Sequence, residues 1–145
     1  MKAVVQRVKS ATLKVGGELI SQIGDGLVVY FGVGKGDDKS KADFLAGKIS
    51  KLRVFNDENG KMNKSVLDVN GEILSVSQFT LYGDTSHGNR PSYIGAEEPE
   101  KANNLYEYFC AKLIENGVVT KKGIFGADIK ILQENDGPVT IIYEV

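Results

Sequence analysis

The chain has 145 residues, with 18 basic and 19 acidic side chains and a formal net charge of −1 at pH 7. This length suits a single domain over residues 1–145 that buries about two-thirds of the surface of its unfolded chain. The near-neutral balance excludes a global positive field that would guide the protein along a nucleic-acid duplex, so we expect no DNA partner.

The N-terminal segment mixes charged residues with short apolar runs and does not form the apolar core of a signal peptide. No apolar run approaches the ~20 residues that span a bilayer, so no membrane partner is expected. Cys110 is the only cysteine. It cannot form an internal disulfide, which is typical of a reducing compartment, and we expect a cytoplasmic protein.

The first predicted elements are strands. Residues 3–8 and 11–15 favour extended chain, and a further extended segment follows at 18–23. Between them, Gly16 and Gly17 supply the two residues of a tight turn. The sequence therefore predicts an antiparallel hairpin at the start of the chain.

An apolar run and a helical pattern follow the hairpin. Residues 27–33 are apolar over the length of a buried strand. The next segment has the apolar spacing of a helix, for which Asp38 or Ser40 could be the N-terminal cap. The side chains that would share its buried face are Leu45, Ile49 and Leu52.

A second helix is predicted after a strand and a long loop. Residues 72–81 have the pattern of a buried strand, and residues 85–95 form a polar loop of a length that often carries function. Pro99 suits the first turn of the helix, and Gly117 would end it. Its apolar stripe consists of Ala102, Leu105, Phe109 and Leu113.

The chain ends in two further predicted strands, at residues 128–133 and 138–145. Strands outnumber helices and lie together in runs, not in βαβ alternation, which indicates a single α+β domain. We expect a largely antiparallel, barrel-like sheet with two main helices.

The usual catalytic residue types are scarce. His87 is the only histidine, and nothing in the sequence pairs it with a serine and a carboxylate, so no Ser-His-Asp triad is indicated. Cys110 lies among the apolar positions of the second helix and is interpreted as a core residue, not as a thiolate nucleophile. Asp37 and Asp38 are interpreted as a helix entry, so neither a metal nor another cofactor is expected.

Four short motifs carry a resemblance. SQFT occupies residues 77–80, GNRP residues 88–91, FGAD residues 125–128 and NDGPVT residues 135–140. In this order the motifs resemble those of the D-aminoacyl-tRNA deacylases, and the likeness runs over the whole length, including KAVVQRV near the start. Four motifs in the right order are far more specific than any one of them.

The resemblance implies a homodimeric enzyme that hydrolyses the ester between a D-amino acid, or glycine, and the 3′-terminal ribose of tRNA. Gly137-Pro138, joined by a cis peptide bond, would enter the partner subunit's pocket. There, backbone carbonyls would bind the amino group of the substrate, and an L-side chain would collide with the backbone. The residues implied to line the pocket around the ester are Ser77, Gln78, Phe79 and Thr80.

The resemblance also implies how the ester is cleaved. The 2′-hydroxyl of the terminal ribose would help to position or activate water, and backbone N–H groups near Phe79 and Thr80 would stabilise the oxyanion. No side-chain base or cofactor is then required. Thr80 as a nucleophile is the alternative, but a threonine hydroxyl needs an activating base.

Two positions depart from the family pattern, since His87 stands where a lysine is usual and Ile129 where a methionine is usual. Without the resemblance, Ser77 and Thr80 could simply make turn hydrogen bonds at a strand end. Gly137-Pro138 could likewise be a hairpin turn.

Two other classes of function stay open. The chain could be a dimeric module that binds an amino acid or a nucleotide end without turnover, or a general esterase with Thr80 as nucleophile. Arg90 could be a solvated loop charge or a contact to a tRNA phosphate. A single-stranded tRNA end needs stacking and a few contacts, not a long basic groove, so the near-neutral charge is compatible with tRNA.

Overall fold

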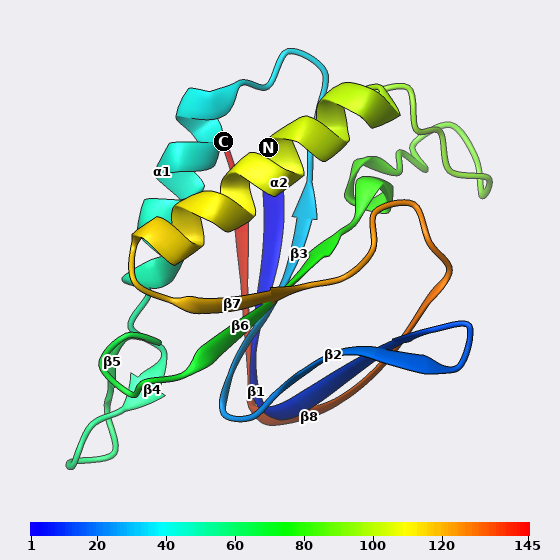
Figure 1. Cartoon of the computed structure of the whole chain (residues 1–145). Helices are drawn as coiled ribbons and strands as arrows, with labels where there is room; N and C mark the ends of the chain where they lie inside the picture. The colour runs from blue at the N-terminus through cyan, green and yellow to red at the C-terminus, as the bar shows by residue number, and fades with distance from the viewer.

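The computed structural model describes all residues, from Met1 to Val145, as one α+β domain (Figure 1). This confirms the predicted fold class. No helix in it has both the length and the apolar character needed to span a membrane. In chain order the elements are β1 (Lys2–Val15), β2 (Glu18–Ile23), β3 (Gly26–Gly32), α1 (Lys39–Ser50), β4 (Phe55–Asn56), β5 (Met62–Lys64), β6 (Glu72–Ser77), the short 3-10 turn η1 (Phe79–Tyr82), α2 (Pro99–Glu115), β7 (Val119–Lys122) and β8 (Ile129–Glu144).

The long strand β1 organises the sheet. Its two halves pair antiparallel with β2 and β3, and β8 pairs antiparallel along almost its full length. Gly16 and Gly17 join β1 to β2 with φ angles of 57° and 86°, which glycine adopts without steric cost. The predicted hairpin is confirmed, and the two extended segments before the turn form one strand.

The C-terminal part of the chain is one strand, not the two that the sequence predicted. β8 pairs with β1 from the Val15–Ile129 pair to the Lys2–Glu144 pair, with register shifts between β1 residues 6 and 10. These shifts accommodate the extra residues around Gly137-Pro138 in β8. Proline has no N–H for a ladder hydrogen bond, so it suggested a strand end, whereas a bulge keeps the strand continuous.

Part of the sheet is parallel. β6 pairs in parallel with β3 on one side and with β7 on the other. α1 and the small β4–β5 hairpin connect β3 to β6, and α2 connects β6 to β7. The expectation that the chain avoids βαβ alternation was therefore wrong for this region. The antiparallel pairings of β1, and of β4 with β5, still make the sheet largely antiparallel.

Two apolar clusters cover the two faces of the sheet. Along β3, Leu27, Val29 and Phe31 belong to the cluster under α1 and α2, whereas Val28 belongs to the second cluster. This alternation is the two-residue period of a strand. The second cluster lies within the curved, nearly closed sheet and includes side chains of β1, β2 and β6. Each fully buried aliphatic or aromatic side chain of this size stabilises the fold by about 1.5–3 kcal/mol.

The helix ends agree with the sequence, apart from one residue. Asp38 caps α1, and its carboxylate accepts a hydrogen bond of 3.2 Å from a first-turn backbone N–H. α1 ends before Leu52, which is only partly buried and does not belong to the helical face as predicted. α2 begins at Pro99, and Gly117 follows it with a φ of 92°, so the predicted start and stop are confirmed.

Candidate active site

The chain leaves the sheet where the first motif begins. β6 ends at Ser77, the Gln78 N–H donates to the Phe31 carbonyl at 2.8 Å, and η1 follows. The predicted strand was therefore too long at its C-terminal end. A Cβ on Gly32, the last residue of β3, would lie 3.0 Å from the Gln78 carbonyl oxygen. The turn thus crosses closely over a position without a side chain.

A cavity of about 480 Å³ opens beside this turn. The end of β6, the start of α2, the segment before β8 and the first residues of β8 form its walls. Its volume and mainly apolar walls are those of a small-molecule site. The lining residues are Val33, Val76, Ser77, Gln78, Phe79, Glu97, Pro99, Ala102, Ile124, Phe125, Gly126, Ala127, Ile129 and Ile131.

The cavity brings together three of the four residues assigned to the pocket from the sequence. Ser77, Gln78 and Phe79 line it, whereas Thr80 does not. The Thr80 hydroxyl instead accepts a hydrogen bond from the side-chain amide of Gln78. An amide N–H is a donor and not a base, so this contact does not activate the hydroxyl as a nucleophile.

Phe79 forms an aromatic edge of the cavity. Its side chain is 56% exposed, and its ring meets Tyr93 edge to face, with ring centroids 5.0 Å apart. An aromatic ring held by a neighbour yet open to solvent provides a surface on which a nucleobase can stack.

The backbone of η1 offers hydrogen-bond donors next to the cavity. The N–H groups of Phe79 and Thr80 come first in the turn, where no carbonyl of the turn itself can accept from them. The far end of the turn is closed, because the Gly83 N–H donates to the Thr80 carbonyl at 2.9 Å. Two adjacent N–H groups of this kind can stabilise a negative charge that develops on a substrate oxygen.

Glu97 places a carboxylate in the cavity wall. Its side chain is 10% exposed and accepts a hydrogen bond of 2.7 Å from the Lys101 ammonium. The hydrogen bond from Lys101, with a further one from the Glu98 backbone N–H, holds the pKa of Glu97 below its usual value. Near neutral pH the cavity wall therefore carries a charge-paired carboxylate.

Gly137-Pro138 lies outside this cavity, on the exposed side of β8. The peptide bond is cis, the geometry that the resemblance implies, and Gly137 has a φ of 121°. Behind it, the buried Arg7 side chain donates from Nε to the Asp136 carbonyl at 3.1 Å and from its guanidinium to the Val54 carbonyl. Within one chain, the two segments that carry the resemblance do not share a pocket.

Three other residues considered from the sequence, His87, Arg90 and Cys110, do not line the cavity beside η1. His87 and Arg90 line a separate polar cavity of about 440 Å³, together with Tyr82 and Asp84. Cys110 is buried, and burial raises the pKa of its thiol to about 11, so the sulfur is protonated near neutral pH. This confirms its interpretation as a core residue.

Several residues of the cavity wall were not among the site residues predicted from the sequence. Phe125 and Gly126 stand in the FGAD motif, which was the available signal for them. Val33 and Glu97 come from the ends of elements that meet only in the folded chain, so no local pattern indicated them. Ile129, noted as a departure from the family pattern, lies directly in the cavity wall.

Comparison with known proteins gives matches along almost the whole chain. A family model described as D-Tyr-tRNA(Tyr) deacylase matches residues 4–144. A D-aminoacyl-tRNA deacylase of Geotalea daltonii is 54% identical over 144 residues, which are 99% of this chain and 96% of that protein. A D-aminoacyl-tRNA deacylase of Thermosipho melanesiensis is 53% identical over 145 residues, covering 99% and 97% of the two chains.

Two solved structures are also similar. One, titled c-Myc DNA Unwinding Element Binding Protein, is 44% identical, with a TM-score of 0.94 over 100% of this chain and 99% of that one. The other, a probable eukaryotic D-amino acid tRNA deacylase, is 16% identical, with a TM-score of 0.85 over 99% and 98% of the two chains. At that identity the second match shows a shared fold alone.

Proposed function

This chain belongs to the D-Tyr-tRNA(Tyr) deacylase family, and we propose that it is a D-aminoacyl-tRNA deacylase. It would hydrolyse the ester between a D-amino acid and the 3′ end of tRNA. The observation that carries the proposal is the family match over residues 4–144, joined to a cavity whose rim consists of Ser77, Gln78 and Phe79.

The cavity supports a mechanism that uses the main chain. An aminoacyl ester is already activated, and the 2′-hydroxyl of the terminal ribose can help to position the attacking water. The N–H groups of Phe79 and Thr80 would stabilise the oxyanion, and a preorganised donor of this kind is worth roughly 3 kcal/mol in other enzymes. The Thr80 hydroxyl accepts from Gln78 and has no base beside it, which favours this mechanism over a covalent one.

The chirality filter is proposed to come from a second copy of the chain. Ser77 lines the cavity and Gly137-Pro138 does not, and both Gly137 and Pro138 are exposed. β8 also presents Leu132 and Ile142 to solvent, at 78% and 72% exposure, as an interface between two chains requires. In a two-fold dimer each chain would supply its Gly137-Pro138 to the other chain's cavity.

Selectivity for D-amino acids follows from this arrangement. The carbonyls at Gly137-Pro138 would hold the ammonium of the substrate, and the η1 N–H groups would hold its ester. With both groups fixed, a D-side chain can point outward, whereas an L-side chain meets backbone. Glycine has no side chain to reject, so glycyl-tRNA should also be a substrate.

A deacylation assay tests the proposal. The purified protein is incubated with D-Tyr-tRNA, L-Tyr-tRNA and glycyl-tRNA, with no metal added beyond what tRNA folding needs. We expect loss of the D-tyrosyl and glycyl esters while the L-tyrosyl ester persists. Rapid cleavage of L-Tyr-tRNA would contradict the chirality filter. Binding of D-Tyr-tRNA without any turnover would favour a binding module.

A further inference from the structure

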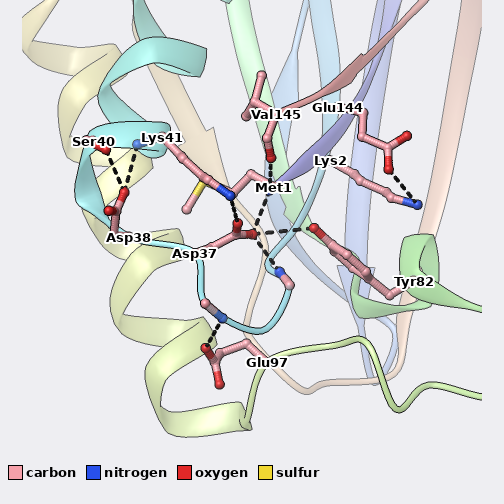
Figure 2. A network of polar contacts seen from close by, with 12 residues as sticks. Met1, Lys2, Asp37, Asp38, Ser40, Lys41, Tyr82, Glu97, Glu144 and Val145 are labelled. Carbon is pink, nitrogen blue, oxygen red and sulfur yellow. Dashed lines mark hydrogen bonds and ion pairs between the residues drawn. The ribbon is translucent and has the colours of Figure 1, made fainter.

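The α-amino group of Met1 is buried inside the domain. As a whole residue Met1 is 1% exposed, and its nitrogen lies 2.6 Å from Oδ2 of Asp37, a carboxylate whose side chain is 3% exposed (Figure 2). The nitrogen also donates to the Val145 carbonyl at 2.7 Å, and the Met1 side chain is 0% exposed within the main core. The N-terminal ammonium is therefore one half of an ion pair that has little access to water.

Asp37 is the centre of this group of contacts. Besides the Met1 ammonium, it accepts hydrogen bonds from the Gly34 N–H at 2.7 Å and from the Lys41 ammonium at 2.8 Å. Burial would raise the pKa of Asp37, but the hydrogen bonds from Lys41 and from the N-terminal amine outweigh burial and lower it. If the Met1 ammonium is lost, Lys41 is the only cation left beside this buried carboxylate, and loss of a partner from a buried ion pair is destabilising.

Two residues connect the Met1 ammonium to η1. The Tyr82 hydroxyl lies 3.4 Å from Oδ2 of Asp37, and Tyr82 is the last residue of η1. The Lys2 ammonium lies 5.0 Å from the centre of the Tyr82 ring (Figure 2). The Tyr82 ring also packs so closely on Gly34 that a Cβ there would lie 2.5 Å from its Cζ. The position of the first residues of the chain is thus transmitted to η1.

A second connection runs to the cavity wall. The loop that carries Gly34 and Asp37 begins with Val33, which lines the cavity. The Val33 carbonyl accepts from the Glu97 N–H at 3.0 Å, and the Gly36 N–H donates to the Glu97 carboxylate at 3.4 Å. Val33 and Glu97 therefore hold one wall of the cavity, and this wall is attached to the loop that Asp37 anchors.

We propose that the unblocked α-ammonium of Met1 is a positioning group of the active site. Through Asp37 it fixes the Val33–Asp37 loop and, through Tyr82, η1. A formyl or acetyl group on this nitrogen would remove the positive charge and add atoms at a residue that is only 1% exposed. An additional residue before Met1 would do the same.

A free Met1 ammonium requires that one class of reaction, the hydrolytic removal of an N-terminal acyl group, takes place before the enzyme is fully active. Any acyl group on the Met1 nitrogen has to be removed hydrolytically: water cleaves the amide C–N bond, the carboxylic acid leaves, and the freed amine takes up a proton. Met1 itself has to remain, because its side chain fills part of the core and its nitrogen would otherwise be displaced by one residue. Where enzyme activity is measured, the positioning role of Met1 rests on the proposed deacylase function. Melting temperature and hydrogen exchange test that role without it.

The test compares four forms of the full chain. They are the unmodified protein, the same protein with the N-formyl group retained, a form with Gly-Ser added before Met1, and a form with Gly-Ser inserted after Gly60. Gly60 is exposed in the turn between β4 and β5, and a Cβ there would meet nothing within 4 Å, so the last form is a matched control. Measurements are the melting temperature, hydrogen exchange of residues 33–37 and 79–83, and kcat/KM for D-Tyr-tRNA at a temperature at which every form is folded.

We expect the formylated and N-terminally extended forms to melt about 6 °C lower or more. Exchange of residues 33–37 and 79–83 should accelerate, and kcat/KM should fall about tenfold or more. The form with the insertion after Gly60 should match the unmodified protein. A protein that combines the N-terminal extension with Asp37→Asn should differ little in melting temperature from the more affected of the two single forms, because both changes break the Met1–Asp37 ion pair.

A stability control separates positioning from general loosening. Val66→Ala removes buried volume from the core, and Val66 does not line the cavity, so it should lower the melting temperature without changing exchange at 79–83. Equal exchange at 79–83 in the N-terminally extended form and in Val66→Ala would overturn the proposal. If even the unmodified protein hydrolyses no D-Tyr-tRNA, the deacylase function fails, and the exchange data still decide the role of Met1.

Discussion

The two segments that carry the resemblance lie in different surroundings. Ser77–Phe79 ends a buried strand, lines a cavity and is fixed by backbone hydrogen bonds. Gly137-Pro138 is exposed on β8, held from behind by Arg7, and lies outside that cavity. The first segment lies at a cavity, whereas the second has a defined backbone geometry and does not line that cavity. Under the proposed function, a single chain therefore holds the cavity and the filter in two separate places, and a second chain would be needed to bring them together.

The largest expected effect comes from Gly137→Ala. A Cβ at this position would lie 3.0 Å from Val139 Cγ2 and 3.1 Å from the Arg7 guanidinium, at a φ of +121° that L-residues rarely adopt. We expect kcat/KM for D-Tyr-tRNA to fall about 100-fold, because a small displacement of a positioning group is costly. Gly16→Ala is the matched control: its φ is +57°, nothing lies within 4 Å, and activity should persist. Full activity of Gly137→Ala would remove Gly137 from the site.

Phe79→Ala tests the other segment. Loss of the exposed ring removes a stacking surface worth roughly 1–3 kcal/mol per base, so KM for D-Tyr-tRNA should rise about tenfold, with a smaller change in kcat. Phe44 on α1 is 51% exposed and far from the motifs in sequence, so Phe44→Ala is a suitable control that should leave KM unchanged. A lower kcat at unchanged KM would instead place Phe79 in the chemical step.

The scaffold should respond to acid through Asp37. The pKa of Asp37 is lowered in the folded chain. Its contribution to the free energy of unfolding is therefore fully present above the ordinary carboxyl pKa of about 3.9 and is lost as pH falls through the lower folded pKa. The melting temperature should therefore drop below about pH 4, and Asp37→Asn should reduce the slope of that drop. An identical acid profile for the variant, followed by circular dichroism, would contradict a stabilising role for this carboxylate.

Thr80→Ala should have the smallest effect. Thr80 does not line the cavity, and only its backbone N–H is assigned to the oxyanion, so activity should stay within about threefold of the unmodified enzyme. Mass spectrometry of the enzyme during turnover should detect no acyl adduct. An ester trapped on Thr80 would replace the main-chain mechanism with a covalent one.

Local features could be predicted from the sequence. The Gly16-Gly17 turn, the Asp38 cap, the start of α2 at Pro99 and the buried Cys110 follow from turn chemistry, capping and periodicity, which act over a few residues. The motif residues Ser77, Gln78 and Phe79 were found by their order along the chain, and they do line a cavity.

Features set by long-range contacts could not be predicted. The parallel neighbours of β6 depend on the order of strands in the sheet, which no local pattern encodes. Pro138 suggested a break within what is one strand, because a bulge is defined by the partner strand. Val33 and Glu97 in the cavity wall and the Met1 ammonium beside Asp37 come together only through the tertiary fold.

The most direct test of a site shared between two chains is complementation of two inactive variants. Gly137→Ala disables the filter, and Ala127→Trp fills the cavity wall; each variant alone should form dimers with little activity. After mixing and subunit exchange, half of the dimers contain one of each, and each of these has one cavity and one filter intact. If the site is shared between two chains, about a quarter of the unmodified activity per chain should be recovered. No recovery, although mass spectrometry detects the mixed dimers, would contradict a shared site.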